Sequence, residues 1–145
     1  MKNVLLLFLL LVGISGQVIS KNYPSADDKA WKKFFKEFKA AVSSGNKDLI
    51  YKMTDFSAMD KEDFDSVSEI FFEGEAKEKF AKAKSSDAKP SEQEFDGLGV
   101  AKDCMQLSFE EKGSDDEGNV YESALIFYFA KVKGKYKLVY LMAAG

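Results

Sequence analysis

The chain has 145 residues, a formal net charge of −3 and a hydrophobic content of 46%, and it includes thirteen phenylalanines. This composition is typical of a globular domain and excludes a disordered or low-complexity chain. The mild negative charge argues against non-specific nucleic-acid binding, which needs a basic surface to displace counterions.

Histidine and arginine are both absent, so all 21 basic residues are lysines. Without histidine, the chain lacks the usual general base near neutral pH and the commonest metal ligand. Without arginine, it lacks the rigid fork that binds carboxylates and phosphates in bidentate fashion. The single cysteine, Cys104, cannot form an intramolecular disulfide, and a Cys–His nucleophile pair is excluded. Its place in an alternating apolar run predicts a small buried hydrophobe.

The first 20 residues have the pattern of a signal peptide. Lys2 gives a positive start, residues 4–12 are unbroken apolar, and small residues follow. The apolar run is about ten residues long, half the ~20 that a bilayer requires, so no stable membrane span is expected. Cleavage is expected after Ser20, with Ser15 as the alternative. We therefore predict a secreted or periplasmic protein whose residues 21–145 form a single domain.

A long amphipathic helix is expected to open this domain. Apolar residues recur at helical spacing from Trp31 to Val42, and lysines occupy the opposite side. Ser25 is the predicted N-cap, and Gly45 the predicted end of the helix. The lysine stripe could bind an anionic partner, although a solvated helix face is the favoured interpretation.

Three shorter helices are expected to follow, a second one after Asn46, a third from Asp60 and a helical continuation over residues 75–84 around Phe80. Residues 55–57 separate the second helix from the third. The side chains expected to face inward from the second and third helices are Leu49, Ile50, Met53, Phe64, Val67, Ile70 and Phe71.

From Asp103 the apolar period changes from helical spacing to two, which predicts strands. Residues 85–94 are polar and contain Pro90, so we expect a loop there. Two strands are predicted around an acidic turn at residues 113–118, and a tight turn at residues 133–135 is expected before the last strand. In that last strand, one face is predicted to carry Tyr136, Leu138, Tyr140 and Met142, and the other Val139 and Leu141.

Helices followed by an antiparallel meander imply an α+β fold, with the N-terminal helices packed on one face of a curved sheet of three to four strands. The other sheet face is expected to be half apolar, which usually marks a partner, a ligand or a second subunit. The residues predicted to form this outer interface are Ile126, Tyr128, Val139 and Leu141.

The pattern resembles a group of uncharacterised exported bacterial domains with a nuclear-transport-factor-like or cystatin-like fold. The likeness is carried by residues 31–38, 40–42, 45–48, 70–72 and 127–138, and the resemblance as a whole extends over most of the mature chain. The resemblance implies a pocket for small molecules between the helices and the concave sheet. Some relatives are enzymes that use an Asp with a Tyr or His in this pocket, and no such pair can be matched by position here. Fold likeness alone does not carry function.

No sequence motif supplies a metal site or a cofactor site, and none of either is predicted. The acidic residues 115–117 lack the spaced ligands of a calcium loop and are interpreted as a solvated turn. Aromatic residues with polar tips, together with one carboxylate between helices, are the remaining candidates for ligand binding. These candidates are Trp31, Tyr51, Asp55, Tyr128 and Tyr140.

Three hypotheses stay open. The first is a non-enzymatic domain of the cell envelope that binds a small apolar or amphipathic ligand, or a protein partner, and a solid core would count against the ligand pocket. The second is an interaction protein, including a homodimer through the outer sheet face, which requires that face to be exposed. The third is a small pocket enzyme with an Asp/Tyr pair, which requires a buried carboxylate of raised pKa.

Overall fold

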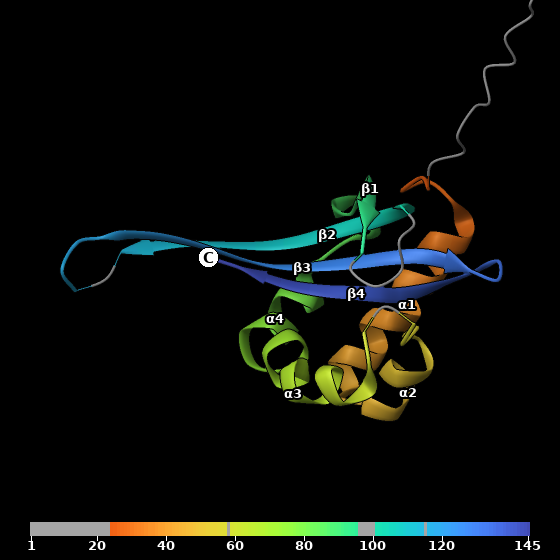
Figure 1. Ribbon diagram of the computed structural model, residues 1–145, viewed down its shortest axis with the longest axis horizontal. Coiled ribbons are helices and arrows are strands. Elements are labelled where there is room, and N and C mark those ends of the chain that lie inside the picture. The colour runs from red at the N-terminus through yellow and green to blue at the C-terminus, as the bar shows by residue number, and fades with distance from the viewer. Residues whose placement is uncertain (1–23, 58, 96–100, 115) are drawn as a thin grey trace, which may run out of the picture.

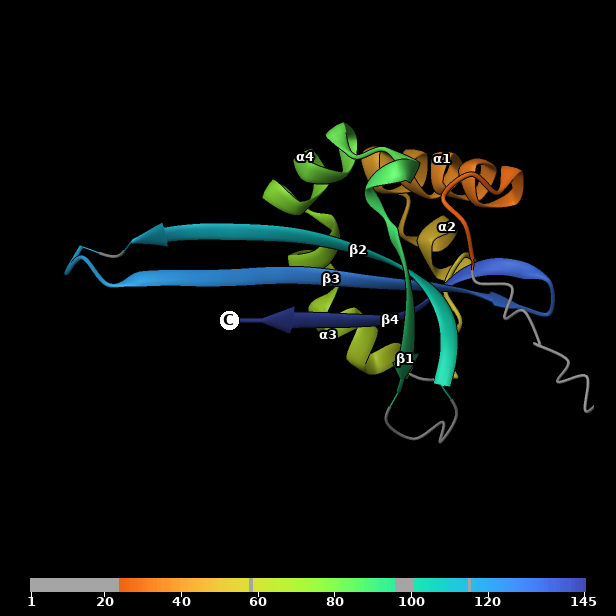
Figure 2. The same ribbon diagram turned by 90° about the horizontal axis from the view of Figure 1, so that it is seen from above.

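The computed structural model describes residues 24–57, 59–95, 101–114 and 116–145, apart from the side chains of residues 101 and 102. The predicted signal peptide and its two cleavage sites lie outside the described residues. Four helices precede a four-stranded antiparallel sheet of order β1-β2-β3-β4, as Figures 1 and 2 show, which confirms the predicted α+β class. Within the described ranges, no helix is long and apolar enough to span a membrane. The elements are α1 (Lys29–Ser44), α2 (Lys47–Lys52), α3 (Lys61–Phe72), α4 (Gly74–Lys82), a 3₁₀ turn (Ser85–Asp87), β1 (Lys89–Glu94), β2 (Ala101–Ser114), β3 (Val120–Val132) and β4 (Lys135–Ala144).

Helix α1 forms where the apolar period predicts it, but its N-cap differs from the prediction. The Asp28 carboxylate accepts a hydrogen bond from the Ala30 N–H at 2.8 Å and caps the helix. The Ser25 carbonyl accepts from the Asp28 N–H at 3.0 Å, so Ser25 instead closes a turn ahead of the helix. Gly45 ends the helix with a φ of 65°, a left-handed conformation that suits glycine. All six residues predicted to face inward from α1 are buried: Trp31, Phe34, Phe35, Phe38, Ala41 and Val42.

The N-caps of α2 and α3, in contrast to that of α1, are those predicted. The Asn46 side chain accepts from the Leu49 N–H at 3.0 Å, and the Asp60 side chain accepts from the Asp63 N–H at 2.7 Å. Leu49, however, is exposed rather than directed inward.

Ile70 on α3 is the larger departure from the predicted inward faces. Its side chain is 58% exposed, whereas Phe64, Ser68, Phe71 and Phe72 are buried. Each residue turns about 100° around a helix axis, so Ile70 lies about 200° from both Ser68 and Phe72. Because two large phenylalanines settle the orientation of the helix, Ile70 must point away from the core.

Strand β1 replaces part of the predicted loop over residues 85–94. It pairs antiparallel with β2, from Lys89 opposite Gln106 to Glu94 opposite Ala101. Its polar sequence carries no period-two signal because β1 is an edge strand that buries little of its surface. Pro90 fits such a position, since an edge strand leaves one row of N–H groups unpaired.

A β-bulge shifts the register between β3 and β4. Phe129 pairs with Leu138, whereas Tyr128 pairs with Tyr140, so Val139 is the extra residue on β4. A bulge reverses the alternation of side chains along the strand beyond it.

The bulge overturns the predicted faces of β4 only after Val139, since Tyr136 and Leu138 face the main core and Val139 faces outward as predicted. Tyr140 lies on the outer face of the sheet, against Phe95 and Tyr128. Leu141 is buried on the inner face within the main core, so its predicted outward position is wrong. The sequence alone gave no sign of the bulge, because residues on both sides of it are apolar.

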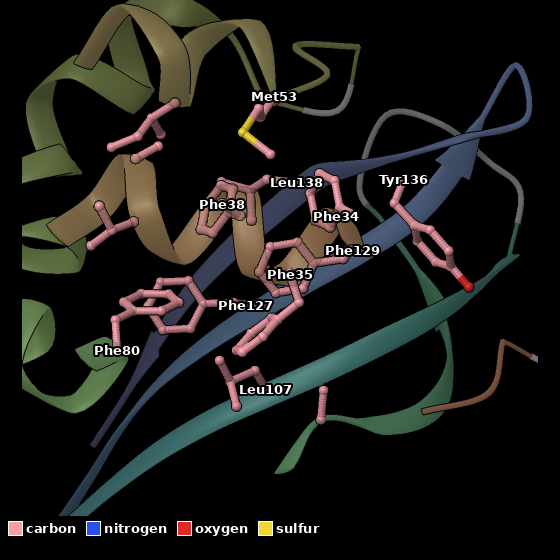
Figure 3. Close-up of a cluster of buried hydrophobic side chains, with 14 of the residues drawn as sticks. Phe34, Phe35, Phe38, Met53, Phe80, Leu107, Phe127, Phe129, Tyr136 and Leu138 are labelled. Carbon is pink, nitrogen blue, oxygen red and sulfur yellow. The ribbon is translucent and has the colours of Figure 1, made fainter. Parts of the chain in front are cut away.

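Phenylalanine rings fill the space between the helices and the sheet, as Figure 3 shows. Phe38 of α1 lies 5.2 Å from Phe129 of β3, with ring planes at 80°. Phe80 of α4 lies 4.8 Å from Phe127, at 73°. These edge-to-face contacts are the favoured geometry of aromatic pairs, and they make this part of the core solid.

Strands β2 and β3 extend far beyond the rest of the sheet. The pairing of β1 ends at Gln106 of β2, and β4 ends with Ala144 opposite Ala124 of β3. Residues 111–114 and 120–123 therefore pair only with each other, and we call this hairpin end, with its turn, the arm. In Figures 1 and 2 the arm reaches well past α3, α4 and the end of β4.

Candidate functional site

The five residues predicted to bind a ligand do not meet at one site. Trp31 is fully buried in the core, where its Nε1–H donates to the Ser85 carbonyl at 2.9 Å. Tyr51 is half-buried at the margin of the same core and packs against Phe56 and Phe64. The ammonium of Lys61 lies 4.9 Å from the centre of the Tyr51 ring, a cation–π contact.

Asp55 lies at the edge of the sheet, in the break between α2 and α3 where the sequence places it. Its N–H donates to the Leu138 carbonyl at 2.8 Å, so this segment extends the hydrogen bonding of β4. Its carboxylate accepts from the Ser57 hydroxyl at 2.8 Å. Asp55 is thus occupied in a local turn.

Tyr128 and Tyr140 lie together on the outer face of the sheet, with Phe95 against both rings at 5.5 and 5.1 Å. Burial, with Cys104 and Tyr140 nearby, raises the pKa of the Tyr128 hydroxyl. Tyr128 and Cys104 belong to a small second cluster that also contains Val139. The buried position of Cys104 agrees with the prediction.

The outer interface predicted for Ile126, Tyr128, Val139 and Leu141 is only partly present. Ile126 is half-buried on the outer face. Tyr128 and Val139 lie on that face but are buried, and Leu141 is on the opposite face. A homodimer through this face would require all four side chains to be exposed, and none of them is fully exposed.

One Asp/Tyr pair does form, from residues that the sequence did not single out. The Asp28 carboxylate accepts from Lys131 Nζ at 2.9 Å and from the Tyr136 hydroxyl at 3.2 Å. The hydrogen bonds from Lys131 and from the Ala30 N–H lower the pKa of Asp28. Burial and the neighbouring carboxylate raise the pKa of Tyr136. Both pKa values move away from neutral pH, so this pair is suited to fixing the start of α1 against the β3–β4 hairpin.

No group of three potential metal ligands occurs among the described side chains. The acidic turn at residues 115–117 is described only in part, because residue 115 lies outside the described ranges.

A groove of about 360 Å³ lies between the α3–α4 corner and the inner face of β2 and β3, and we call it the arm groove. It arises because the helical layer ends at this corner while the sheet continues. Its lining residues are Glu69, Ile70, Glu73, Gly74, Glu75, Ala76, Lys79, Phe109, Glu111, Ser123, Ala124, Leu125, Ala143 and Ala144.

The floor of the arm groove is apolar. Phe109 and Leu125 are half-buried side chains that continue the inner face of the sheet outward from the core. The exposed Ile70 side chain faces this floor from α3. Further out, Tyr121 is 47% exposed, and its ring covers Gly113, where any β-carbon would collide with it. On this face the polar pair of Glu111 and Ser123 separates Tyr121 from Phe109 and Leu125.

The rim of the arm groove is acidic. Glu69, Glu73, Glu75 and Glu111 face a single lysine, Lys79, so the lining carries a formal charge of −3. Lys79 Nζ lies 2.9 Å from the Glu75 carboxylate and 3.9 Å from that of Glu111. Its charge is already shared by two carboxylates, which leaves the negative potential of the other two uncompensated at the rim.

A second surface groove, of about 440 Å³, runs along the exposed side of α1 and has the opposite charge. Four lysines line it, with the ring of Phe35 beneath them, and its lining contains no carboxylate. Lys39 donates to the Ala83 carbonyl at 2.8 Å, and Lys32 pairs with Asp27 at 3.1 Å. The two grooves therefore carry opposite formal charges.

Comparisons with protein-family models, with curated proteins and with solved structures find no match for this chain.

Sequence reasoning missed the arm groove, although one signal for it was present. At about 3.3 Å per residue, a strand of 14 residues such as β2 spans about 46 Å. A helix of 16 residues such as α1 spans only about 24 Å. No single helix of this length covers such a strand, so whether the sheet face is covered to its end depends on how the shorter helices are placed.

Proposed function

We propose that this protein is an exported, non-enzymatic binding protein that captures a polypeptide partner through the arm groove. The observation that carries the proposal is the overhang of β2 and β3, which leaves apolar side chains uncovered beside an acidic rim. Apolar residues surrounded by polar ones are the usual anatomy of a protein–protein interface.

The small-ligand pocket expected between the helices and the sheet has less support. Phe38, Phe80, Phe127 and Phe129 occupy that region in mutual contact. The arm groove instead lies at the surface between the helices and the sheet, with the exposed Ile70 in its lining, where a segment of another protein can reach it. A small amphipathic molecule is the alternative occupant, and native mass spectrometry of the protein from its own source would reveal it as a bound adduct.

Export to the periplasm or outside the cell is part of the proposal, and the signal-peptide pattern of residues 1–20 supports it. We also propose the nuclear-transport-factor-like or cystatin-like arrangement for the domain. Its support is the order of helices and then a curved antiparallel meander.

An arm-shortened variant tests the proposed function. Residues 110–124 are replaced by Asn-Gly, which removes Glu111, Ser123 and Ala124 from the groove lining and favours a two-residue hairpin turn between the paired residues Phe109 and Leu125. Both chains are cross-linked in cells of the source organism, and the joined peptides are mapped by mass spectrometry. We expect adducts through the groove in the parent chain, loss of these adducts in the variant, and a cooperative unfolding transition in both chains, which shows that the variant is folded. Identical adducts in both chains would contradict the proposal.

A further inference from the structure

We infer that the segment bound in the arm groove is a basic amphipathic helix of the partner, with an apolar stripe and lysines or arginines along its sides. This inference rests on the proposed function and adds the chemistry of the partner.

The groove favours a helix over an extended strand. Its floor is a face of the sheet, where Phe109 and Leu125 present side chains rather than free backbone groups. An extended segment lying there would find no backbone partners, whereas a helix satisfies its own hydrogen bonds. The position also continues the layer in which α3 and α4 already pack on this sheet face.

The size of the floor sets the length of the helix. From Phe109 to Gly113, β2 advances four residues, or about 13 Å. A helix covers that distance with about nine residues, or two to three turns. An apolar residue at every third or fourth position would contact Ile70 and Phe109 in the groove and then Tyr121 beyond its lining, and a basic residue between them would meet Glu111.

The charge of the rim selects a basic helix. Glu69 stands on the α3 side of the groove, and Glu111 stands on the sheet side, two residues beyond Phe109 on the same face of β2, so a bound segment would meet carboxylates from both layers. A helix with basic residues beside its apolar stripe would meet opposite charges at both edges, and an acidic helix would meet like charges. Helix α1 of a second copy of this protein is itself basic and amphipathic, but it cannot occupy the groove because its apolar side is buried in its own core.

Two designed peptides of about 14 residues probe this chemistry, a length at which an amphipathic helix can form on a surface. One contains leucine and lysine with the leucines on a single stripe, and the other replaces each lysine by glutamate. Fluorescence anisotropy of the labelled peptides against the mature chain measures binding. We expect the leucine–lysine peptide to bind at least about tenfold more tightly than its acidic counterpart.

Matched charge reversals locate the binding. The double variant Glu69→Lys/Glu111→Lys reverses both edges of the groove. The control Glu37→Lys/Glu78→Lys makes the same change in net charge at two exposed helical positions outside it. We expect the first variant to weaken binding of the leucine–lysine peptide about tenfold and the control to change it less than about twofold.

Equal binding of the two peptides, or equal loss in both double variants, would overturn the inference. Absence of peptide binding would overturn it as well. In each case the cross-linking comparison with the arm-shortened variant still decides the proposed function separately, because that experiment assumes nothing about the partner's charge.

Discussion

Alanine substitution at Ile70 tests whether its side chain points outward, as in the structure, or inward, as the sequence pattern predicts. The same substitution at the neighbouring buried residue Phe71 is the matched comparison. The helical period predicts that both side chains face the core. In the structure, Ile70 is 58% exposed, and Phe71 is 3% exposed with its ring 5.4 Å from that of Phe127. Truncation of each residue to alanine should therefore have very different effects on the free energy of unfolding.

The expected magnitudes follow from burial. Ile70→Ala removes three carbon groups that are less than half covered, a loss of about 1 kcal/mol at ~0.8 kcal/mol per buried group. The higher helix propensity of alanine offsets a few tenths of a kcal/mol, which leaves about 0.5 kcal/mol. Phe71→Ala opens a cavity in an aromatic core and should cost about 3–5 kcal/mol.

Urea unfolding measures both variants, with the fluorescence of the single, buried Trp31 as the signal. With a slope of about 1.5–2 kcal/mol/M, the midpoint should fall by about 2 M for Phe71→Ala and by about 0.3 M for Ile70→Ala. Equal losses in the two variants would refute the outward orientation of Ile70, and with it the apolar wall of the arm groove.

Three further predictions test separate contacts. Asp28→Asn should lower the free energy of unfolding at pH 7 by less than about 1 kcal/mol, since its ion pair with Lys131 is partly exposed. The folded pKa of Asp28 lies below its unfolded value near 3.9, so the stability difference between parent and variant should be complete above about pH 5 and vanish as pH falls through the folded pKa. Urea titrations of both chains at several pH values measure it, and a pH-independent difference would refute this role of the Asp28 carboxylate. The Tyr121 ring covers Gly113 in the parent chain, so the Gly113 α-protons should show an upfield NMR shift, and Gly113→Ala should displace the ring. Ordinary chemical shifts for these protons in the parent chain would count against this packing. The Cys104 thiol should react slowly with Ellman's reagent in the folded protein and rapidly in urea, and fast reaction without denaturant would contradict its burial.

Local signals predicted much of the helical half of the fold. Asn46 and Asp60 cap their helices because their side chains compete for free N–H groups at short range, which depends on neighbouring residues alone. The turn at Lys133 and Gly134 has positive φ at both residues, as a tight hairpin requires, and it too depends on local sequence.

The features that escaped prediction depend on long-range packing. The bulge at Val139 is a feature of the pairing between β3 and β4, and no residue next to it in the sequence indicates it. Ile70 points outward because Phe71 and Phe72 orient the helix against the sheet. The candidate site was missed for the same reason, because the arm groove exists only where two layers of unequal length meet.

Photo-cross-linking from single positions tests the binding role of the arm groove most directly. A photoreactive amino acid is placed at Ile70, or at the exposed control position Glu78, in the full chain expressed in its source organism. Mass spectrometry then identifies the peptide joined to each position. The proposal predicts a defined, lysine- or arginine-rich segment of another protein attached at Ile70 and not at Glu78. Reaction with water alone at Ile70, or the same products at both positions, would contradict it.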